Sequence, residues 1–415
     1  MLRLFTRSIS NGFEKLNAWL RLGLRLLPAF ARSAANSFHA PNAWLRLGLR
    51  LLVFLPLLAL VLLPACDHEK DKPGEDTQGL AALSGADTTG YARAYEPREF
   101  RFPADAGPHP DFKTEWWYWT GNLTAGDGRR FGYQFTVFRQ ALAPDSISGS
   151  EWRSRQLYFA HLALSDIDGE RFYPFERFSR GVAGLAGAQA DPFRVWIDNW
   201  QATGHPDSVR LFAEQDGFGI DLSLRATKPR VLQGERGLSR KSGDPGNASY
   251  YYSRTRQETR GHVLLNGERV PITGRSWLDR EWSTSVLAEE QSGWDWFSLQ
   301  FDDGTELMLY QLRLRDGGVD PFSSGIFIDV DGGTQKLESR DFRIVPRSSW
   351  TSPRTGITWP SGWDISIVPL GMILRITPMQ DDQEMPLSVL YWEGAVRVTG
   401  DRGGYGYVEL TGYEE

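Results

Sequence analysis

The sequence predicts an all-β protein built from antiparallel strands that are joined by tight turns. Aromatic residues make up 13% of the chain, and their flat rings fit the half-buried faces of pleated sheets. Six Asn-Gly or Asp-Gly pairs lie between runs of alternating residues, which is the strongest short hairpin signal because a type I′ turn needs positive φ at both central residues. No stretch sustains a helical period. The aromatic excess also suits an apolar ligand pocket, although a packed sheet needs no ligand.

The strands follow in order along the chain. They are expected at residues 113–123 and 130–139 across Asp127-Gly128, at 156–165 and 171–178 across Asp168-Gly169, at 209–214 and 219–224 across Asp216-Gly217, at 263–265 and 269–272 across Asn266-Gly267, at 293–301 and 306–313 across Asp303-Gly304, and at 326–330 before Asp331-Gly332. Strands joined by hairpins close into up-and-down barrels or sandwiches, and closure removes exposed edges.

The ordered part is expected to form two domains. About 310 residues exceed one ordinary antiparallel barrel. The best break is the polar stretch STSVLAEEQ at residues 283–291, which separates two aromatic strands. The predicted domains are residues 98–284 and residues 285–415.

Residues 1–65 are expected to be a signal region outside the fold. Residues 51–65 (LLVFLPLLALVLLPA) form an apolar run that is too short for a membrane span but suits a signal-peptide core, and Arg46 and Arg50 precede it. The letters NAWLRLGLRLL occur at residues 17–27 and again at 42–52. A duplicated signal region or a misplaced start codon is favoured over an amphipathic helix on the membrane surface.

Cys66 is the only cysteine of the chain, so no intrachain disulfide is possible. The residues Leu63-Pro64-Ala65-Cys66 resemble the bacterial lipobox, although that pattern usually has a small or hydroxyl residue at Pro64. The pattern predicts lipidation of Cys66 and a place on the periplasmic face of the cell envelope, and Asp67 favours the inner membrane. The alternative is a buried cysteine in an N-terminal helix. Residues 66–97 are rich in charge, Gly, Ser and Thr, which predicts a flexible tether.

Several function classes lack support in the sequence. The net charge of −6 gives no indication of nucleic-acid binding. There is no P-loop, dinucleotide fingerprint, Gly-x-Ser-x-Gly elbow or metal-binding histidine pair, and the six histidines are scattered. We therefore expect neither a cofactor nor a metal.

Two clusters stand out as candidate sites. In the first, FPADAGPHPDFKTEWWY at residues 102–118, Glu115 and Trp117 point to one side of a strand, while Trp116 and Tyr118 point to the other. In the second, WLDREW, one face carries Trp277, Asp279 and Glu281, and the opposite face carries Leu278, Arg280 and Trp282.

The clusters favour acid catalysis or binding in an apolar cavity. Asp279 and Glu281 are the candidate catalytic acids, because a carboxyl group beside tryptophan has a raised pKa. Trp282 is the third catalytic candidate, because an indole face stabilises a carbocation. The candidate pocket residues are Glu115, Trp117, Trp277, Arg280, Trp294 and Trp296. The structural alternative is that Arg280 pairs with a buried carboxylate such as Glu115, and we expect these two residues in one interior cluster.

Three segments resemble the AttH/carotenoid 1,2-hydratase family: FPADAGPHPDFKTEWWYWTGNL at residues 102–123, WLDREW at 277–282 and GYGYVELTGY at 404–413. The resemblance covers nearly all of residues 100–415 and implies two consecutive lipocalin-like antiparallel β-barrel domains. The family includes a hydratase that adds water to a terminal double bond of acyclic carotenoids, relatives that catalyse pericyclic ring closures, and exported members labelled as hydrolases.

The resemblance implies that this chain differs from the hydratases at one residue of the candidate active site. The hydratases carry a histidine where this chain has Arg280, whereas Trp282 is shared. Arginine cannot usefully give up its proton, so Asp279 or Glu281 would have to serve as the acid.

Three functions follow as hypotheses. The first is a membrane-anchored, lipocalin-like protein that binds a lipid or isoprenoid at the envelope, with an envelope transport complex as a candidate partner. The second is a hydratase or lyase that protonates a carbon–carbon double bond. The third is hydrolysis, for which the sequence offers no residue constellation.

Overall fold

The computed structural model describes residues 88–144, 155–284 and 287–413, all of which belong to one compact unit. Cys66 and the predicted signal region lie outside the described residues. Within those described, two antiparallel sheets account for nearly all secondary structure, beside three short 3-10 helices, η1 (Ala104–Ala106), η2 (Ser339–Asp341) and η3 (Val368–Leu370). No helix among them is long and apolar enough to cross a membrane.

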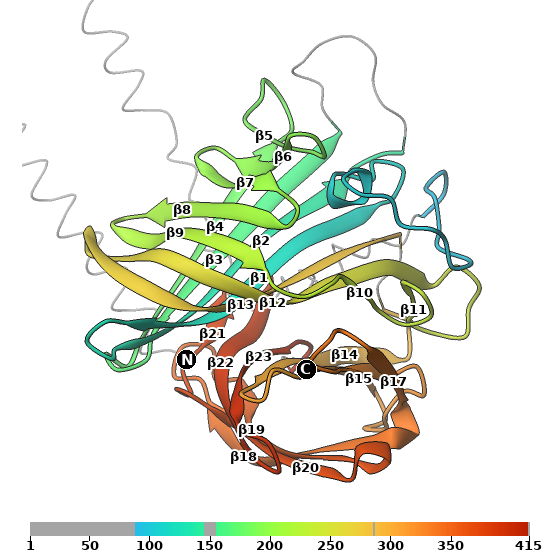
Figure 1. Ribbon diagram of the computed structural model, residues 1–415. Coiled ribbons are helices and arrows are strands. Elements are labelled where there is room, and N and C mark those ends of the chain that lie inside the picture. The colour runs from blue at the N-terminus through green and yellow to red at the C-terminus, as the bar shows by residue number, and fades with distance from the viewer. Residues whose placement is uncertain (1–87, 145–154, 285–286, 414–415) are drawn as a thin grey trace, which may run out of the picture. The chain divides into compact units, whose positions relative to one another are not determined.

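The first sheet has thirteen strands within the described residues. They are β1 (Thr114–Ala125), β2 (Arg130–Ala141), β3 (Gln156–Asp166), β4 (Arg171–Arg180), β5 (Ala186–Gln189), β6 (Phe193–Ile197), β7 (Trp200–His205), β8 (Ser208–Gln215), β9 (Phe218–Ala226), β10 (Val231–Leu232), β11 (Leu238–Arg240), β12 (Ala248–Leu265) and β13 (Glu268–Ser283). The order is β4-β3-β2-β1-β13-β12-β9-β8-β7-β6-β5, with β10 and β11 paired to β12. Because β4 and β5 are not paired with each other, this sheet is an open half-barrel (Figure 1).

The second sheet has ten strands in the described part of the chain. They are β14 (Gln291–Phe301), β15 (Glu306–Leu314), β16 (Ser324–Ile328), β17 (Thr334–Glu338), β18 (Phe342–Thr351), β19 (Thr358–Ile367), β20 (Met372–Pro378), β21 (Glu384–Pro386), β22 (Leu390–Gly400) and β23 (Gly404–Leu410). The order is β17-β16-β15-β14-β23-β22-β20-β19-β18, with β21 paired to β22, and the sheet curls into a nearly closed barrel (Figure 1). The predicted fold class, two consecutive lipocalin-like antiparallel barrels, is confirmed.

All six turn signals lie between strands that pair antiparallel: β1–β2, β3–β4, β8–β9, β12–β13, β14–β15 and β16–β17. Only Asp216-Gly217 and Asn266-Gly267 have positive φ at both residues, as a type I′ turn requires. At three of the others the glycine alone takes positive φ, and after Asp168-Gly169 it is Glu170 that does so. The Asn-Gly and Asp-Gly pairs therefore predicted the positions of the hairpins correctly, but fewer of the hairpins than expected have the backbone of a type I′ turn.

The last residues of the predicted tether pack against the first sheet. The Tyr91 hydroxyl donates to the Ala141 carbonyl at 3.1 Å, and the Tyr250 hydroxyl donates to the Glu96 carbonyl at 3.0 Å. Ala94 is buried. Residues 91–96 thus have ordered contacts in the fold.

The two sheets also pack on each other. Each sheet encloses its own apolar core, and a third buried layer, which includes Tyr118, Trp277, Trp296 and Tyr310, lies where the sheets meet. The approach is close at Gly132, where an added Cβ would lie 2.6 Å from the Tyr407 hydroxyl. This contact needs a glycine, and it brings β2 against β23.

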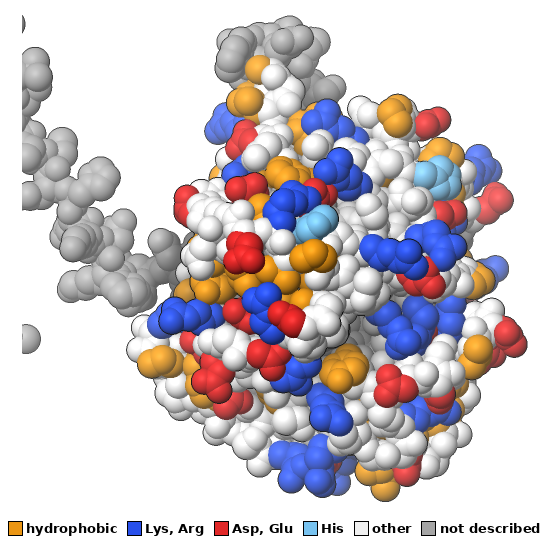
Figure 2. Space-filling model, turned by 60° about the vertical axis from the view of Figure 1, so that its left-hand side comes forward, with side chains coloured by type: hydrophobic (Ala, Val, Ile, Leu, Met, Phe, Trp, Pro, Cys, Tyr) orange, Lys and Arg blue, Asp and Glu red, His pale blue; other side chains and the backbone are white. Residues whose placement is uncertain are grey.

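Charged side chains of both signs are interspersed over the face shown in Figure 2. That distribution is typical of a solvated surface and unlike the clustered basic stripe of a nucleic-acid-binding protein.

Candidate functional site

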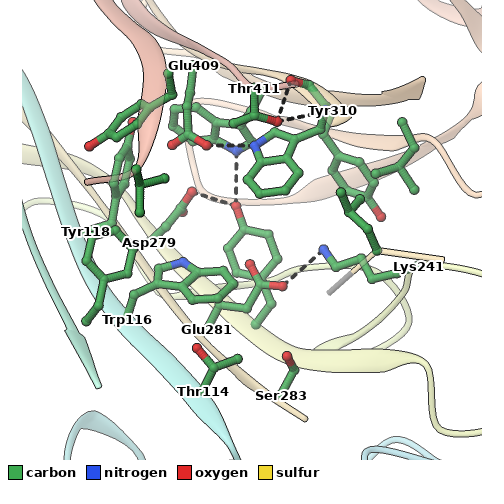
Figure 3. A pocket seen from close by; sticks show the side chains of 18 of the residues that line it. Thr114, Trp116, Tyr118, Lys241, Asp279, Glu281, Ser283, Tyr310, Glu409 and Thr411 are labelled. Atoms are coloured by element: carbon green, nitrogen blue, oxygen red, sulfur yellow. Dashed lines mark hydrogen bonds and ion pairs between the residues drawn. The ribbon is translucent and has the colours of Figure 1, made fainter. Parts of the chain in front are cut away.

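A cavity of about 120 Å³ lies between the two sheets. Its wall is formed by rings from both sheets, namely Trp116, Tyr118, Phe138, Tyr251, Trp294, Trp296, Tyr310 and Tyr391, together with aliphatic groups and the polar side chains of Asp279, Glu281, Glu409 and Lys241. Figure 3 shows Asp279 and Glu281 approaching it from the first sheet and Glu409 from the second. An aromatic cavity with a few convergent ionisable groups is the usual form of a small-molecule site.

The strand register explains why these residues meet. In the antiparallel pair of β1 and β13, Trp116 lies opposite Glu281 and Tyr118 lies opposite Asp279. Directly opposed residues project from the same face of a sheet. These four side chains therefore share the face that is turned toward the second sheet.

Asp279 is a buried carboxyl group with three hydrogen-bond donors. The Trp277 indole donates at 2.7 Å and the Tyr251 hydroxyl at 2.5 Å, and the Ser253 hydroxyl also donates. Burial nevertheless raises the pKa of Asp279 to about 7, because the three donors do not offset the lost solvation and the nearby Glu281 carboxylate raises the pKa further. The group is thus available near neutral pH as an acid that can give up its proton.

Glu281 is held by a cation. Its carboxylate forms an ion pair with the Lys241 ammonium at 3.0 Å and accepts a hydrogen bond from the Ser249 hydroxyl. Burial lowers the pKa of Lys241, but the Glu281 carboxylate outweighs this effect and the net direction is upward. The ammonium also lies 4.7 Å from the centre of the Tyr310 ring, which favours a fixed position for the pair.

The second sheet contributes a further pair of acids. Burial raises the pKa of Glu409 to about 7, although the Trp294 indole donates to its carboxylate at 2.6 Å. Behind it, burial and the charge of Glu409 raise the pKa of Glu393 well above its usual value. The Tyr118 hydroxyl donates to Glu393 at 2.6 Å and joins the two sheets. The cavity therefore combines two acids that titrate near neutrality with apolar walls.

Four residues expected at the site lie on the opposite face of the same two strands and do not line this cavity. Glu115 and Trp117 lie opposite Trp282 and Arg280, respectively. Glu115 is fully buried and forms ion pairs with both Arg139 and Arg280. The expected interior cluster of Glu115 and Arg280 is therefore present, and the contacts are those of the structural alternative.

Trp282 belongs to the same buried cluster. Its ring stacks on the His109 ring with centroids 3.7 Å apart and planes 5° apart. His109 in turn donates its backbone N–H to Glu115 at 3.1 Å. These contacts hold residues 105–113 over β1 and β13, and they occupy the indole face that was expected to meet a ligand.

The other expected residues lie at or beside the cavity. Trp294 and Trp296 line it, whereas Trp277 supports it through the hydrogen bond to Asp279. Sequence reasoning missed Glu409, Tyr251 and Lys241. Glu409 stands inside the segment GYGYVELTGY, whose alternation places it on the same strand face as Tyr405 and Tyr407, so a signal for its direction was present.

No group of three or more His, Cys, Asp or Glu side chains arranged to hold a metal occurs among the described residues. The carboxyl groups of the cavity have indole, hydroxyl and ammonium partners instead.

The raised pKa values predict a pH-dependent stability. Between pH 4.5 and 7 the folded protein retains protons on Asp279 and Glu409 that the unfolded chain has released. The free energy of unfolding should therefore fall as pH rises, by up to about 1.4 kcal/mol per pH unit for each group. Urea unfolding at pH 5 and pH 8 should show a smaller fall for Asp279→Asn than for the native protein. Equal falls would contradict the assigned protonation.

The fold and cavity define a two-barrel protein with an acidic, aromatic cavity between the barrels. The chain belongs to the AttH-like family, whose model matches residues 93–413. The resemblance seen in the sequence is thereby confirmed.

Solved structures agree with this assignment. An AttH candidate from Nitrosomonas europaea is 35% identical to this chain with a TM-score of 0.70, and the match covers 78% of this chain and 99% of that one. Kievitone hydratase from Nectria haematococca has the same fold at 13% identity and a TM-score of 0.60, covering 77% and 95%. No match was found among curated proteins.

Proposed function

We propose that this protein is a hydratase or lyase that protonates a carbon–carbon double bond of an apolar, isoprenoid-like molecule in the cavity between the sheets. The observation that carries the proposal is Asp279, a carboxyl group with a pKa of about 7 in an aromatic cavity. A general acid works best when its pKa is near the working pH. The hydratase named among the structural neighbours supports the same chemistry.

The reaction follows from the positions of the side chains. Asp279 gives its proton to the less substituted carbon of the double bond, and the other carbon becomes a tertiary cation. Trp116 and Trp296, which line the same cavity, stabilise that cation through their ring faces. Water then forms a bond to the cation and loses a proton, and the product is a tertiary alcohol. The ion pair of Glu281 and Lys241 makes one part of the cavity wall polar, and water can bind there.

A carrier function is the second candidate. The rings and aliphatic groups that dominate the cavity wall favour retention of an apolar molecule even without turnover. The acids of the cavity distinguish the two functions, because a carrier gains nothing from a carboxyl group that is poised to release a proton.

Incubation with geraniol, farnesol and squalene in 18O-labelled water tests the proposal. A hydratase is expected to yield a tertiary alcohol that contains 18O, detected by mass spectrometry. A panel member that co-purifies with the protein but never acquires 18O would establish the carrier function. Failure of every panel member to bind or react would overturn both functions for isoprenoids.

The sequence features around Cys66 support a proposal for location. We propose that lipidation of Cys66 anchors the protein at the periplasmic face of the envelope, where apolar substrates collect, and that Asp67 favours the inner membrane. In this setting an envelope transport complex is a candidate partner that could deliver the ligand.

A Cys66→Ser variant tests the anchor. Without the thiol no lipid can be attached, so nearly all of the protein is expected to move from the membrane fraction to the soluble fraction. Immunoblots of fractionated cells, together with metabolic labelling by a fatty-acid analogue, measure this change. A variant that stays with the membrane to the same extent as the native protein would refute the lipid anchor.

A further inference from the structure

A hydrogen-bonded series of polar side chains links the cavity to the protein surface at β3 and β4. Tyr391, at the start of β22, lines the cavity. Its hydroxyl lies 2.7 Å from Nδ1 of His161 on β3, and Nε2 of His161 lies 2.9 Å from Glu176 on β4. His161 is fully buried, whereas the side chain of Glu176 is 17% exposed. These three residues, two from the β3–β4 hairpin and one from β22, thus connect the cavity with the surface.

The Glu176 carboxylate sets the direction in which the hydrogen bonds of a neutral His161 imidazole run. Burial raises the pKa of Glu176, but hydrogen bonds from His161 and Ser388 outweigh it and the net direction is downward. A carboxylate only accepts hydrogen bonds, so Nε2 of His161 carries a proton. In a neutral imidazole Nδ1 is then the acceptor, and the Tyr391 hydroxyl donates to it.

The other neighbours of His161 hold the ring in place without competing for its nitrogens. Phe138 on β2 and Phe159 on β3 lie with ring centroids 5.3 and 5.6 Å from the imidazole. Gln134 on β2 donates to the Tyr391 oxygen at 3.4 Å. Glu176 and Tyr391 are the titratable groups bonded to the ring.

The phenol oxygen of Tyr391 therefore faces the cavity as a hydrogen-bond acceptor, because its own hydrogen is committed to His161. This order resembles a hydrolase triad with a phenol in the place of the nucleophilic hydroxyl. A phenol so placed receives a hydrogen from a bound water and passes its own hydrogen on.

We propose that Tyr391 is the general base that activates water in the cavity, with His161 and Glu176 as positioning residues that relay the proton outward. The inference rests on the proposed hydration and assigns the water-activating half of it. It separates the acid, Asp279, from the base, which lies on the other sheet.

The proton transfers balance. Asp279 loses its proton to the alkene carbon, and the water oxygen forms a bond to the resulting cation. The water gives one hydrogen to the Tyr391 oxygen as the phenol hydrogen moves to Nδ1 of His161. The imidazolium is stabilised by the Glu176 carboxylate and then releases a proton to solvent at the partly exposed end, while Asp279 regains one from solvent.

The first test needs no substrate. Nitrogen-15 NMR of the histidine-labelled protein at pH 7.5 is expected to show His161 protonated at Nε2 and unprotonated at Nδ1, with the Nδ1 signal shifted in Tyr391→Phe. A proton on Nδ1, alone or with Nε2, would leave the Tyr391 hydroxyl free to donate into the cavity. That result would overturn the assignment of Tyr391 as a base.

The second test separates the two halves of the reaction with geraniol in D2O. Loss of Asp279 should stop both hydration and deuterium exchange into the alkene. Loss of the base in Tyr391→Phe should lower hydration about 100-fold yet retain exchange, because the cation still forms and then loses a proton. His161→Gln should act in the same direction, with a change in kcat rather than KM.

Tyr133→Phe is the matched control. It removes another buried phenol oxygen, bonded to Ser276 at 2.6 Å, from a residue that does not line the cavity, and it should hydrate geraniol at the native rate. If Tyr391→Phe also hydrates at the native rate, the relay is refuted while the hydratase stands. If the native protein hydrates no probe, the hydratase proposal fails and the NMR result alone decides the direction of the hydrogen bonds.

Discussion

Replacement of Asp279 by asparagine is expected to lower the rate of alkene hydration by about 10²- to 10⁴-fold, the usual contribution of a general acid. Asparagine has nearly the shape of the protonated carboxyl group, which is the state that burial favours here. Its oxygen can still accept from Trp277 and Ser253, and its amide can donate to the Tyr251 oxygen. The change therefore removes the transferable proton and little else. Product formation from geraniol in 18O-labelled water measures the effect.

The control for this variant is Asp320→Asn. Asp320 is also a buried carboxyl group, bonded to Gln291 and to the backbone of Phe322, but it does not line the cavity. Its replacement should leave the rate within a few-fold of the native value. An Asp279→Asn protein that retains the native rate would show that another group supplies the proton.

The largest effect on stability is expected for Glu115→Gln, which should lower the free energy of unfolding by about 3–5 kcal/mol. Glu115 is the shared partner of two buried guanidinium groups, Arg139 and Arg280. A neutral amide leaves both cations without a counter-charge in a site with little access to water. Chemical denaturation at pH 7 measures the loss.

An exposed ion pair supplies the comparison. Asp364 pairs with Arg375 at 3.2 Å, and both side chains are about half exposed, so Asp364→Asn should cost less than about 1 kcal/mol. Equal costs for Glu115→Gln and Asp364→Asn would contradict the buried-charge account.

Acid should also weaken the cluster of Glu115 with the two arginines. The two arginines outweigh burial and hold the pKa of Glu115 far below its usual value. The stabilisation is therefore present above pH 4.5 and is lost as pH falls.

Much of the fold was predictable because β-hairpins leave local marks. Each of the six Asn-Gly or Asp-Gly pairs lies in a hairpin, and in five of them the glycine takes a positive φ that other residues avoid. The great length of β12 and β13 was not predicted. The site residues of these two strands lie in the halves that are far from their connecting turn. A turn signal marks only where two strands meet and does not show how far each strand extends.

The candidate site was predictable only in part, and β1 shows why. The two faces of the segment KTEWWY were identified correctly from strand alternation, yet Glu115 and Trp117 were assigned to the same pocket as Asp279. The register decides which face of β1 joins Asp279, and it places Trp116 and Tyr118 there. Register between strands that lie about 160 residues apart in the sequence is set by tertiary packing, which local patterns do not contain.

The same limit applies to residues that meet across the two sheets. Glu409 and Tyr391 reach the cavity only because the second barrel packs on the first. Likewise, the pKa of Asp279 depends on burial that both sheets create. A single sequence names such groups as candidates, and the fold determines which of them share a site.

A crystal structure of the Asp279→Asn variant soaked with geraniol tests the central claim most directly. The account predicts electron density in the cavity between Trp116 and Trp296, with the terminal double bond about 3–3.5 Å from the side chain of residue 279, a separation suited to proton transfer. Density inside either barrel, with this cavity empty, would contradict the assignment of the active site.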